Sequence, residues 1–215
     1  MQFIDLHRQF DQIESEIRKG MDALLAHKQF IMGPEVHELE EQLAHYTGRK
    51  HVLGCSNGTD ALVIPLMAIG LSKEDAVFVP SFTFFATAEC VTLTGGTPVF
   101  VDSDPDTFNI STTALEAAIE KTIAEGKLKP RGIIPVDLFG LSADYEEIDR
   151  IAKKYDLFVL EDAAQGFGGT DQGKRAGAHG DVAATSFFPA KPLGCYGDGG
   201  AIFTGDDELA ALMSS

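Results

Sequence analysis

The sequence is short of the features that mark secreted, membrane-spanning and metal-binding proteins. Its 215 residues include no tryptophan and only three cysteines, Cys55, Cys90 and Cys195, which form no C-x-x-C pair. An odd number of scattered cysteines argues against a disulfide framework and a cysteine zinc site, and the six histidines lack metal-ligand spacing. No apolar run approaches the length of a membrane-spanning helix. We therefore expect reduced thiols, no bound metal and no membrane partner.

Basic residues are also scarce. Lysine and arginine number 17 against 33 acidic residues, which gives a net charge of −16. Such a balance excludes nucleic acid and anionic membranes as expected partners. An anionic ligand would have to be met by local donors such as the backbone amides at helix starts. Met1 to His7 lack the basic and apolar regions of a secretory leader, so we predict a cytoplasmic protein.

The pattern that is present is one of alternating strands and helices. With 44% hydrophobic residues, the chain can bury a sizeable core. Helical periodicity predicts an amphipathic helix over 8–27 and a second helix from Pro34 to a stop at Gly48. Continuous apolar strands are expected at 51–54, 76–80, 98–101, 132–136, 157–160, 182–188 and 199–203. This order predicts an α/β fold with a mixed, mostly parallel sheet between helices, and no G-x-G-x-x-G motif indicates a dinucleotide fold.

One lysine stands out because of its surroundings. Lys191 follows the apolar run 182–188 and lies among glycine, proline and aromatic residues. Desolvation at such a place would lower the pKa of its ammonium group and favour a nucleophilic amine. A structural loop lysine between two buried strands explains this segment equally well.

A pair of acids upstream favours the catalytic interpretation. The strand 157–160 runs directly into Glu161 and Asp162. A pyridoxal phosphate (PLP) enzyme needs an acid that keeps the pyridine nitrogen protonated and a lysine that binds the cofactor aldehyde. An acid and a lysine at the ends of two buried strands fit that requirement.

Four segments resemble the signature segments of the DegT-type sugar aminotransferases, in the family's order and spacing. They are Asn57-Gly58-Thr59-Asp60-Ala61-Leu62, Pro80-Ser81-Phe82-Thr83-Phe84 with Ala86-Thr87, Glu161-Asp162-Ala163-Ala164-Gln165, and Ser186-Phe187-Phe188-Pro189 through Lys191 to Gly200. The similarity extends from about Ile4 to the last residue. It implies the large domain of a fold-type-I PLP enzyme.

The resemblance also implies roles for seven residues. Lys191 would bind the cofactor covalently and move the proton, and Asp162 would pair with the pyridinium nitrogen. Gln165 would hydrogen-bond near the ring hydroxyl, and Phe84 would stack on the ring. The phosphate would be held by Gly58, Thr59 and Ser186. On residue patterns alone, an ordinary helix cap at Asn57 to Thr59 and core packing of Phe84 remain the simpler interpretations.

The implied reaction is transamination of a nucleotide-linked keto-sugar with L-glutamate as amino donor, in amino-sugar and cell-surface polysaccharide (lipopolysaccharide O-antigen) synthesis. The last segment looks most like members that act on UDP-3-keto-N-acetylglucosaminuronate. Three alternatives are a related PLP sugar dehydratase, a regulatory relative, and an inactive fragment. The dehydratases have histidine at the lysine position, so Lys191 argues against a dehydratase. A regulatory relative would have lost Asp162 or Lys191, and both are present.

Two units are expected: a helical arm over 1–30 and a PLP-binding domain over 31–215. By resemblance, a small C-terminal domain is missing, and the full protein would be a homodimer with shared active sites. We further expect Pro65 to kink or end its helix early, 126–130 to form an exposed turn, and Phe82 and Phe85 to lie in the core. Lys174 and Arg175 could contact substrate or be solvated, and Cys195 is expected to be a buried neutral thiol.

Overall fold

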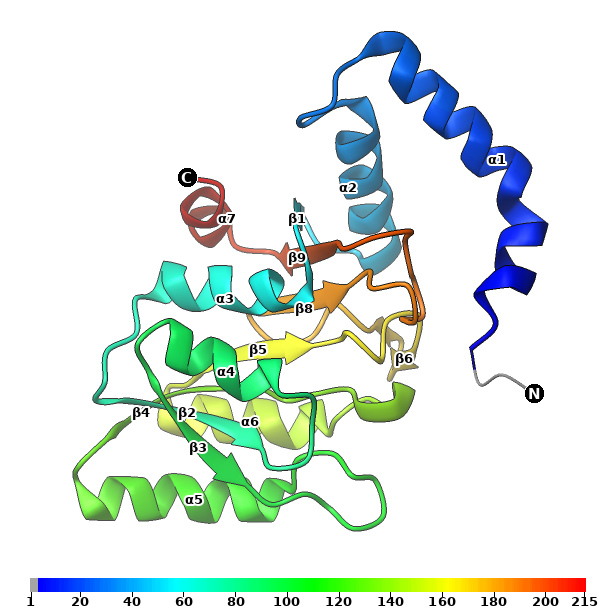
Figure 1. Ribbon diagram of the computed structural model, residues 1–215. Coiled ribbons are helices and arrows are strands. Elements are labelled where there is room, and N and C mark those ends of the chain that lie inside the picture. The colour runs from blue at the N-terminus through cyan, green and yellow to red at the C-terminus, as the bar shows by residue number, and fades with distance from the viewer. Residues whose placement is uncertain (1–3) are drawn as a thin grey trace.

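The computed structural model describes residues 4–215 and shows a seven-stranded sheet between two layers of helices (Figure 1). The sheet has the order β1-β9-β8-β5-β4-β2-β3, and β6 and β7 form a separate two-stranded hairpin. The strands are β1 (His51–Cys55), β2 (Asp75–Pro80), β3 (Thr97–Val101), β4 (Lys129–Ile133), β5 (Phe158–Asp162), β6 (Thr170–Asp171), β7 (Lys174–Arg175), β8 (Val182–Ser186) and β9 (Gly200–Thr204).

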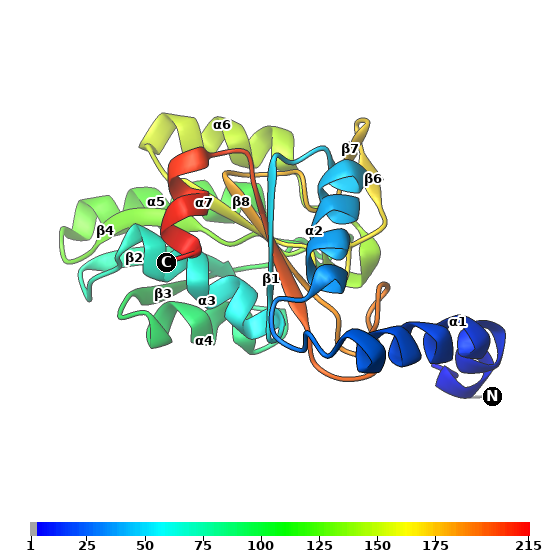
Figure 2. The same ribbon diagram turned by 90° about the horizontal axis from the view of Figure 1, so that it is seen from above.

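The helices cover both faces of the sheet. They are α1 (Leu6–His27), α2 (Pro34–Thr47), α3 (Gly58–Ile69), α4 (Ala86–Leu93), α5 (Thr112–Glu125), the short 3-10 helix η1 (Leu138–Gly140), α6 (Tyr145–Tyr155) and α7 (Asp207–Met213). One face carries α3, α4 and α7, and the other carries α2, α5 and α6 (Figures 1 and 2). Three buried apolar clusters hold the sheet from both sides: one lies under α3, α4 and α7, and two lie on the other face, under α5 with α6 and under α2.

The strand directions bring several chain segments to one edge. β8, β5, β4, β2 and β3 are parallel, while β9 is antiparallel to both β8 and β1. β9 alone thus runs against the other six. Six strands consequently end at the same edge, and β9 begins there. The fold agrees with the predicted mixed, mostly parallel α/β sheet.

Local sequence explains where most helices begin and end. Pro34 occupies the first turn of α2, and Gly48, with φ 76°, ends it. Side chains of Asn57, Ser111 and Asp144 accept hydrogen bonds from backbone amides in the first turns of α3, α5 and α6. The sequence analysis predicted the start of α2 at Pro34 and its end at Gly48.

The structure corrects two expectations about local structure. Of the two outcomes expected for Pro65, an early end of the helix is wrong, since α3 continues to Ile69 with Pro65 buried. Lys129 and Pro130 do not belong to an exposed turn, because they pair with Asp75 and Ala76 as the first residues of β4. In both places, packing between distant segments overrides the local preference.

The helix α1 stands away from the sheet and its covering helices (Figures 1 and 2). None of the residues Leu6–His27 is buried. Its contacts with the rest of the chain include the rings of Phe10 and Tyr196, which meet edge to face with centroids 5.8 Å apart, and a hydrogen bond between the His27 ring and Glu35 of α2 at 2.7 Å. The first three residues of the predicted arm lie outside the described residues. Among the described residues, no helix is both long and apolar enough to cross a membrane.

Candidate cofactor site

Asp162 is a buried carboxylate at the last position of β5. Its Oδ2 accepts a hydrogen bond from Thr87 Oγ1 at 3.0 Å, and its Oδ1 accepts one from the Ala164 amide at 3.2 Å. Burial raises the pKa of Asp162, while these two hydrogen bonds and the charge of Lys191 act to lower it. The arrangement holds a desolvated carboxylate in place, and a cation placed beside it would gain a strong partner.

Lys191 lies in the loop between β8 and β9. The backbone amide of Lys191 donates a hydrogen bond to Phe188 O at 2.8 Å, which holds the first part of this loop. Its side chain is half-buried, so the expected exclusion of water is met only in part. Because its charge acts on Asp162, the acid and the lysine predicted from sequence do lie in one neighbourhood.

The start of α3 is seated directly against the ends of β8 and β9. A Cβ atom on Gly58 would lie 2.5 Å from the Cβ of Ser186, and one on Gly200 would lie 2.5 Å from Asn57 O. Only glycine fits at either contact. The first amides of a helix have no intrahelical acceptor, so this close approach places free donors of α3 beside the Ser186 hydroxyl. Gly58, Thr59 and Ser186 thus gather in the geometry that suits an anion.

Gln165 and Phe84 approach the same edge from two further loops. Gln165 Oε1 accepts a hydrogen bond from the Phe139 amide at 2.9 Å, and its NH₂ group donates no hydrogen bond within the described residues. Phe84 lies between β2 and α4, and its carbonyl accepts from the amide of Thr87 at 3.2 Å. Its ring is 66% exposed, so one face is open to stacking.

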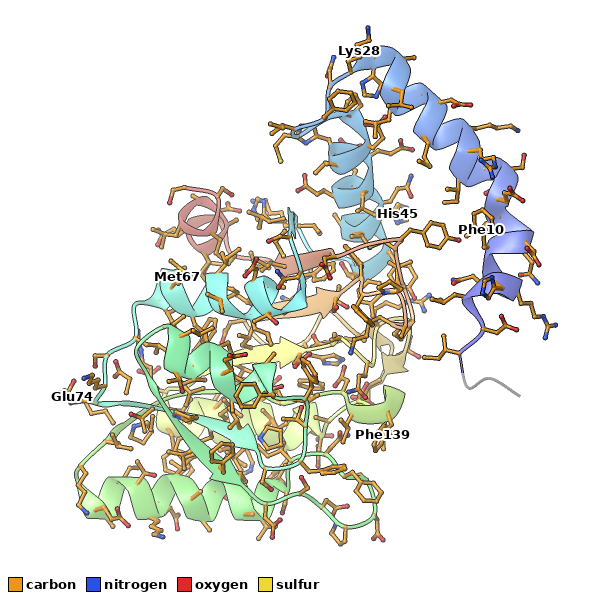
Figure 3. The ribbon with its side chains drawn as sticks, in the orientation of Figure 1. Phe10, Lys28, His45, Met67, Glu74 and Phe139 are labelled. Carbon is orange, nitrogen blue, oxygen red and sulfur yellow. The ribbon has the colours of Figure 1, made fainter. Side chains whose placement is uncertain are left out.

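The neighbours of Phe84 are not core residues, contrary to expectation. Phe82 is 51% exposed and Phe85 is 71% exposed. Phe82 instead packs against Phe108 and Phe139, with ring centroids 5.8 and 6.3 Å apart. The segment follows the end of β2, where the chain leaves the sheet, so its side chains have no core to enter. Figure 3 shows Phe139 at the opposite end of the sheet from Glu74.

Other residues singled out from the sequence have local roles. The Arg175 guanidinium lies over the Tyr46 ring at 4.6 Å, and Lys174 is exposed in the β6–β7 hairpin. Cys195 is half-buried rather than buried, and its thiol donates to Gly197 O at 3.1 Å. Within residues 4–215, no group of three or more histidine, cysteine or acidic side chains could hold a metal ion.

Thr87 is the functional residue that sequence reasoning missed. It is fully buried on α4 and bonds both Asp162 and Thr83, whose hydroxyl lies 3.1 Å away. The available signal was a hydroxyl residue inside the apolar start of a helix, which must find a polar partner.

These residues fit PLP. A buried carboxylate, a nearby lysine, an exposed aromatic face and a phosphate-sized gathering of amides and hydroxyls lie together at one edge, and Gly58 provides the close approach that a Cβ would block.

The sequence profile of the DegT/DnrJ/EryC1/StrS aminotransferase family matches residues 11–215. The chain belongs to this family. The resemblance inferred from the four segments and the fold-type-I fold class are thereby confirmed.

Relatives match almost the whole chain but only part of their own length. A UDP-2-acetamido-2-deoxy-3-oxo-D-glucuronate aminotransferase of Pseudomonas aeruginosa is 52% identical over 99% of this chain and 57% of its own length. A crystal structure of a family member from Brucella abortus is 56% identical, with a TM-score of 0.98 over 100% of this chain and 58% of that one. The structure of NtdA from Bacillus subtilis with bound cofactor PMP has a TM-score of 0.88 at 36% identity, covering 99% of this chain and 47% of that one. The chain thus spans about half to three fifths of the length of these relatives.

Proposed function

We propose that this chain carries most of the cofactor site of a PLP-dependent sugar aminotransferase. The observation that carries the proposal is the carboxylate of Asp162, buried, held by Thr87 and within the electrostatic reach of Lys191. The prediction of PLP as cofactor agrees with the family, which includes a structure with the bound amine form of this cofactor.

The residues have distinct tasks in this proposal. When bound, PLP supplies an electron-accepting ring that stabilises negative charge on the substrate carbon. Asp162 would hold a proton on the pyridine nitrogen, and Phe84 would cover one ring face. Gln165 would donate to the ring hydroxyl. The Lys191 amine would accept the proton that leaves the substrate carbon and, once protonated, would act as the general acid.

The phosphate group is held at the start of α3. Gly58 and Thr59 offer backbone amides there, and Ser186 offers its hydroxyl from the end of β8. The positive end of the helix dipole favours the phosphate dianion. Such local donors suit a chain whose net charge of −16 would otherwise repel it.

The proposed substrate is a nucleotide-linked keto-sugar, best represented by UDP-3-keto-N-acetylglucosaminuronate, with L-glutamate as amino donor. The 52% identity to an aminotransferase of that name supports this choice. Such a reaction belongs to amino-sugar and cell-surface polysaccharide synthesis in the cytoplasm. We propose a homodimer, with an arm over 1–30 and a cofactor-binding domain over 31–215, because α1 buries no side chain of its own.

A PLP sugar dehydratase is the alternative function. Dehydratases of the family resemble this chain but would have histidine where it has Lys191, so the lysine favours transamination. An inactive fragment is the other alternative, and the same experiment tests it.

The test is an absorbance spectrum of the purified chain with PLP, before and after borohydride. We expect a band near the visible edge that becomes a permanent adduct on reduction. Lys191→Ala should abolish the band and the adduct, since no other lysine is expected to reach the cofactor. Lys153→Ala, an exposed lysine on α6, is the matched control and should behave as the unchanged chain.

A spectrum identical to free PLP would contradict the proposal for the 215-residue chain. Repeating the measurement on a chain that extends as far as the full-length relatives would then separate an unassembled site from a wrong cofactor. Addition of L-glutamate should shift the band of a competent aminotransferase.

A further inference from the structure

A pair of buried carboxyl groups lies behind the candidate cofactor site. Asp137 follows β4, and Glu161 directly precedes Asp162 on β5. Both side chains are fully buried. Neighbouring residues of a strand point to opposite faces, so Glu161 faces away from the side on which Asp162 meets Thr87. None of the roles proposed above uses either group.

One oxygen of this pair of carboxyl groups has no hydrogen-bond donor among the described residues. Asp137 Oδ1 accepts from the Ala143 amide at 3.1 Å and the Tyr145 hydroxyl at 2.9 Å. Asp137 Oδ2 receives no N–H or O–H donor from the described residues. The carboxyl group of Glu161 is close enough to act on the pKa of Asp137, and Asp137 acts in turn on the pKa of Glu161. Two carboxylates cannot bond each other unless one of them carries a proton.

The oxygens of Glu161 already accept two backbone donors. The amides of Gly177 and His179 each donate to one oxygen at 2.7 Å. A single proton held between Asp137 Oδ2 and Glu161 joins the two groups and leaves both backbone bonds to Glu161 in place. This arrangement satisfies every polar atom of the pair.

We propose that Asp137 and Glu161 share one proton at neutral pH, and that this pair is a positioning element for Asp162. The shared proton does not depend on the proposed function. The importance of positioning Asp162 for catalysis does rest on the proposed function.

The charges around the pair agree with a single proton. Burial raises the pKa of Asp137 to about 6, and burial and the charge of Asp137 raise the pKa of Glu161 well above its usual range. Near neutral pH the pair therefore has lost one proton and keeps the other.

Other titratable and charged groups surround the pair on every side. Tyr145 of α6 donates to Asp137 and stacks on His179, with ring centroids 4.1 Å apart. Asp162 adds a like charge from β5. Arg49 lies near Glu161 and donates to His179 O and Gly180 O, both at 2.7 Å. One cation therefore stands near a pair that carries one negative charge.

The backbone connects the pair to the cofactor site. The Asp137 amide donates to Asp162 O at 3.0 Å, and the Asp162 amide donates to Pro135 O at 2.9 Å. A Cβ on Gly166, next to Gln165, would lie 2.4 Å from the Cβ of Asp137, so that residue rests directly against the pair. Loss of the proton would put two charges side by side in a medium of low dielectric and separate β4 from β5 at Asp162.

Replacing the carboxyl group by a side-chain amide should have different effects at Asp137 and at Glu161. In Asp137→Asn the new NH₂ group can occupy the place of Oδ2, which has no donor, and bond an ionised Glu161. In Glu161→Gln the new NH₂ group would face the amide donor of Gly177 or His179. We therefore expect the first variant to keep the structure and the second to disturb it.

The proton is tested by unfolding the chain with denaturant between about pH 6.5 and about pH 8.5. The folded chain holds one proton that the unfolded chain has lost, because the pKa of glutamate in an unfolded chain lies well below this range. Stability therefore falls as pH rises toward the folded pKa. Relative to Asp137→Asn, the folding constant of the unchanged chain should fall about tenfold per pH unit. The exposed control Glu41→Gln should run parallel to the unchanged chain. Equal slopes for Asp137→Asn and the unchanged chain would overturn the shared proton.

Positioning is tested without cofactor by hydrogen exchange at the amides of Asp137 and Asp162. Glu161→Gln should lower their protection about tenfold relative to amides of the β2–β3 seam, while Asp137→Asn should leave it unchanged. Protection in Glu161→Gln equal to that of the unchanged chain would overturn the positioning role. PLP binding measured by the absorbance band then shows whether a disturbed Asp162 weakens the cofactor site.

Discussion

The contact between Gly58 and Ser186 is the tightest point of the candidate phosphate site. Because a Cβ on Gly58 would lie 2.5 Å from one side-chain atom of Ser186 and 3.2 Å from its Cα, part of the clash is with backbone that cannot rotate away. Gly58→Ala should therefore push α3 off the end of β8. We expect a loss of about 1 to 3 kcal/mol in unfolding free energy, measured in denaturant, and weaker PLP binding.

Gly20→Ala is the matched control for that substitution. Gly20 lies inside α1, and an added Cβ would meet no atom within 4 Å. Alanine should raise the stability of α1 by up to about 1 kcal/mol and leave PLP binding unchanged. If both alanines weakened PLP binding equally, the close approach would not be the cause.

At the residue scale, sequence predicted the acid and the lysine because each breaks an apolar run. A charge at the end of a buried strand needs a reason, whatever the fold. The exposure of Phe82 and Phe85 could not be predicted in the same way. Aromatic residues favour a core on average, and only the path of the chain after β2 exposes these two. Thr87 and Asp137 needed the fold, because their partners are distant in sequence.

At the scale of elements, one buried side chain joins two loops at the edge that carries the site. Asn109 Nδ2 donates to Leu141 O at 3.0 Å and Ser142 O at 3.1 Å, and its Oδ1 accepts from the Leu138 amide at 3.1 Å. The two loops also present Phe108 and Phe139, both with positive φ. A rarely adopted backbone conformation at two adjacent aromatics indicates that this junction is held firmly.

Asn109→Ala should lower the unfolding free energy by about 2 kcal/mol, because three backbone groups lose their partner. Asn109→Asp should cost more, since its carboxylate would face two carbonyl oxygens. Both values come from denaturant titration, and hydrogen exchange can locate the change to 138–142. An aspartate variant more stable than the alanine variant would contradict this account.

The order of strands and helices was the easiest feature to predict, because parallel strands covered on both faces are continuous apolar runs. Positions that combine an unfavourable local preference with tertiary packing were the hardest. Pro65 inside α3 and Lys129 with Pro130 in β4 are the two examples, and in each the stabilising partner comes from a distant segment.

At the scale of the whole molecule, α1 and the body of the chain differ in how they are stabilised. The body has its own apolar cores on both faces of the sheet. By contrast, α1 exposes Leu6, Met21 and Leu25 and contacts the loop of Lys191 through the Phe10 ring. An amphipathic helix with no fully buried residue gains stability by covering another surface, which supports the proposed homodimer.

Removal of residues 1–30 should therefore separate folding from association. We expect residues 31–215 to unfold cooperatively, with a free energy within about 1 kcal/mol of the full chain when both are monomeric, because no core side chain is lost. Sedimentation should show weaker self-association of the shortened chain. Phe10→Ala, which removes only the ring that contacts Tyr196, is the control for the contact within the chain and should leave association nearly unchanged. A shortened chain that associates as strongly as the full one would place the dimer contact on the body, where the exposed rings of Phe82, Phe108 and Phe139 are the next surface to test.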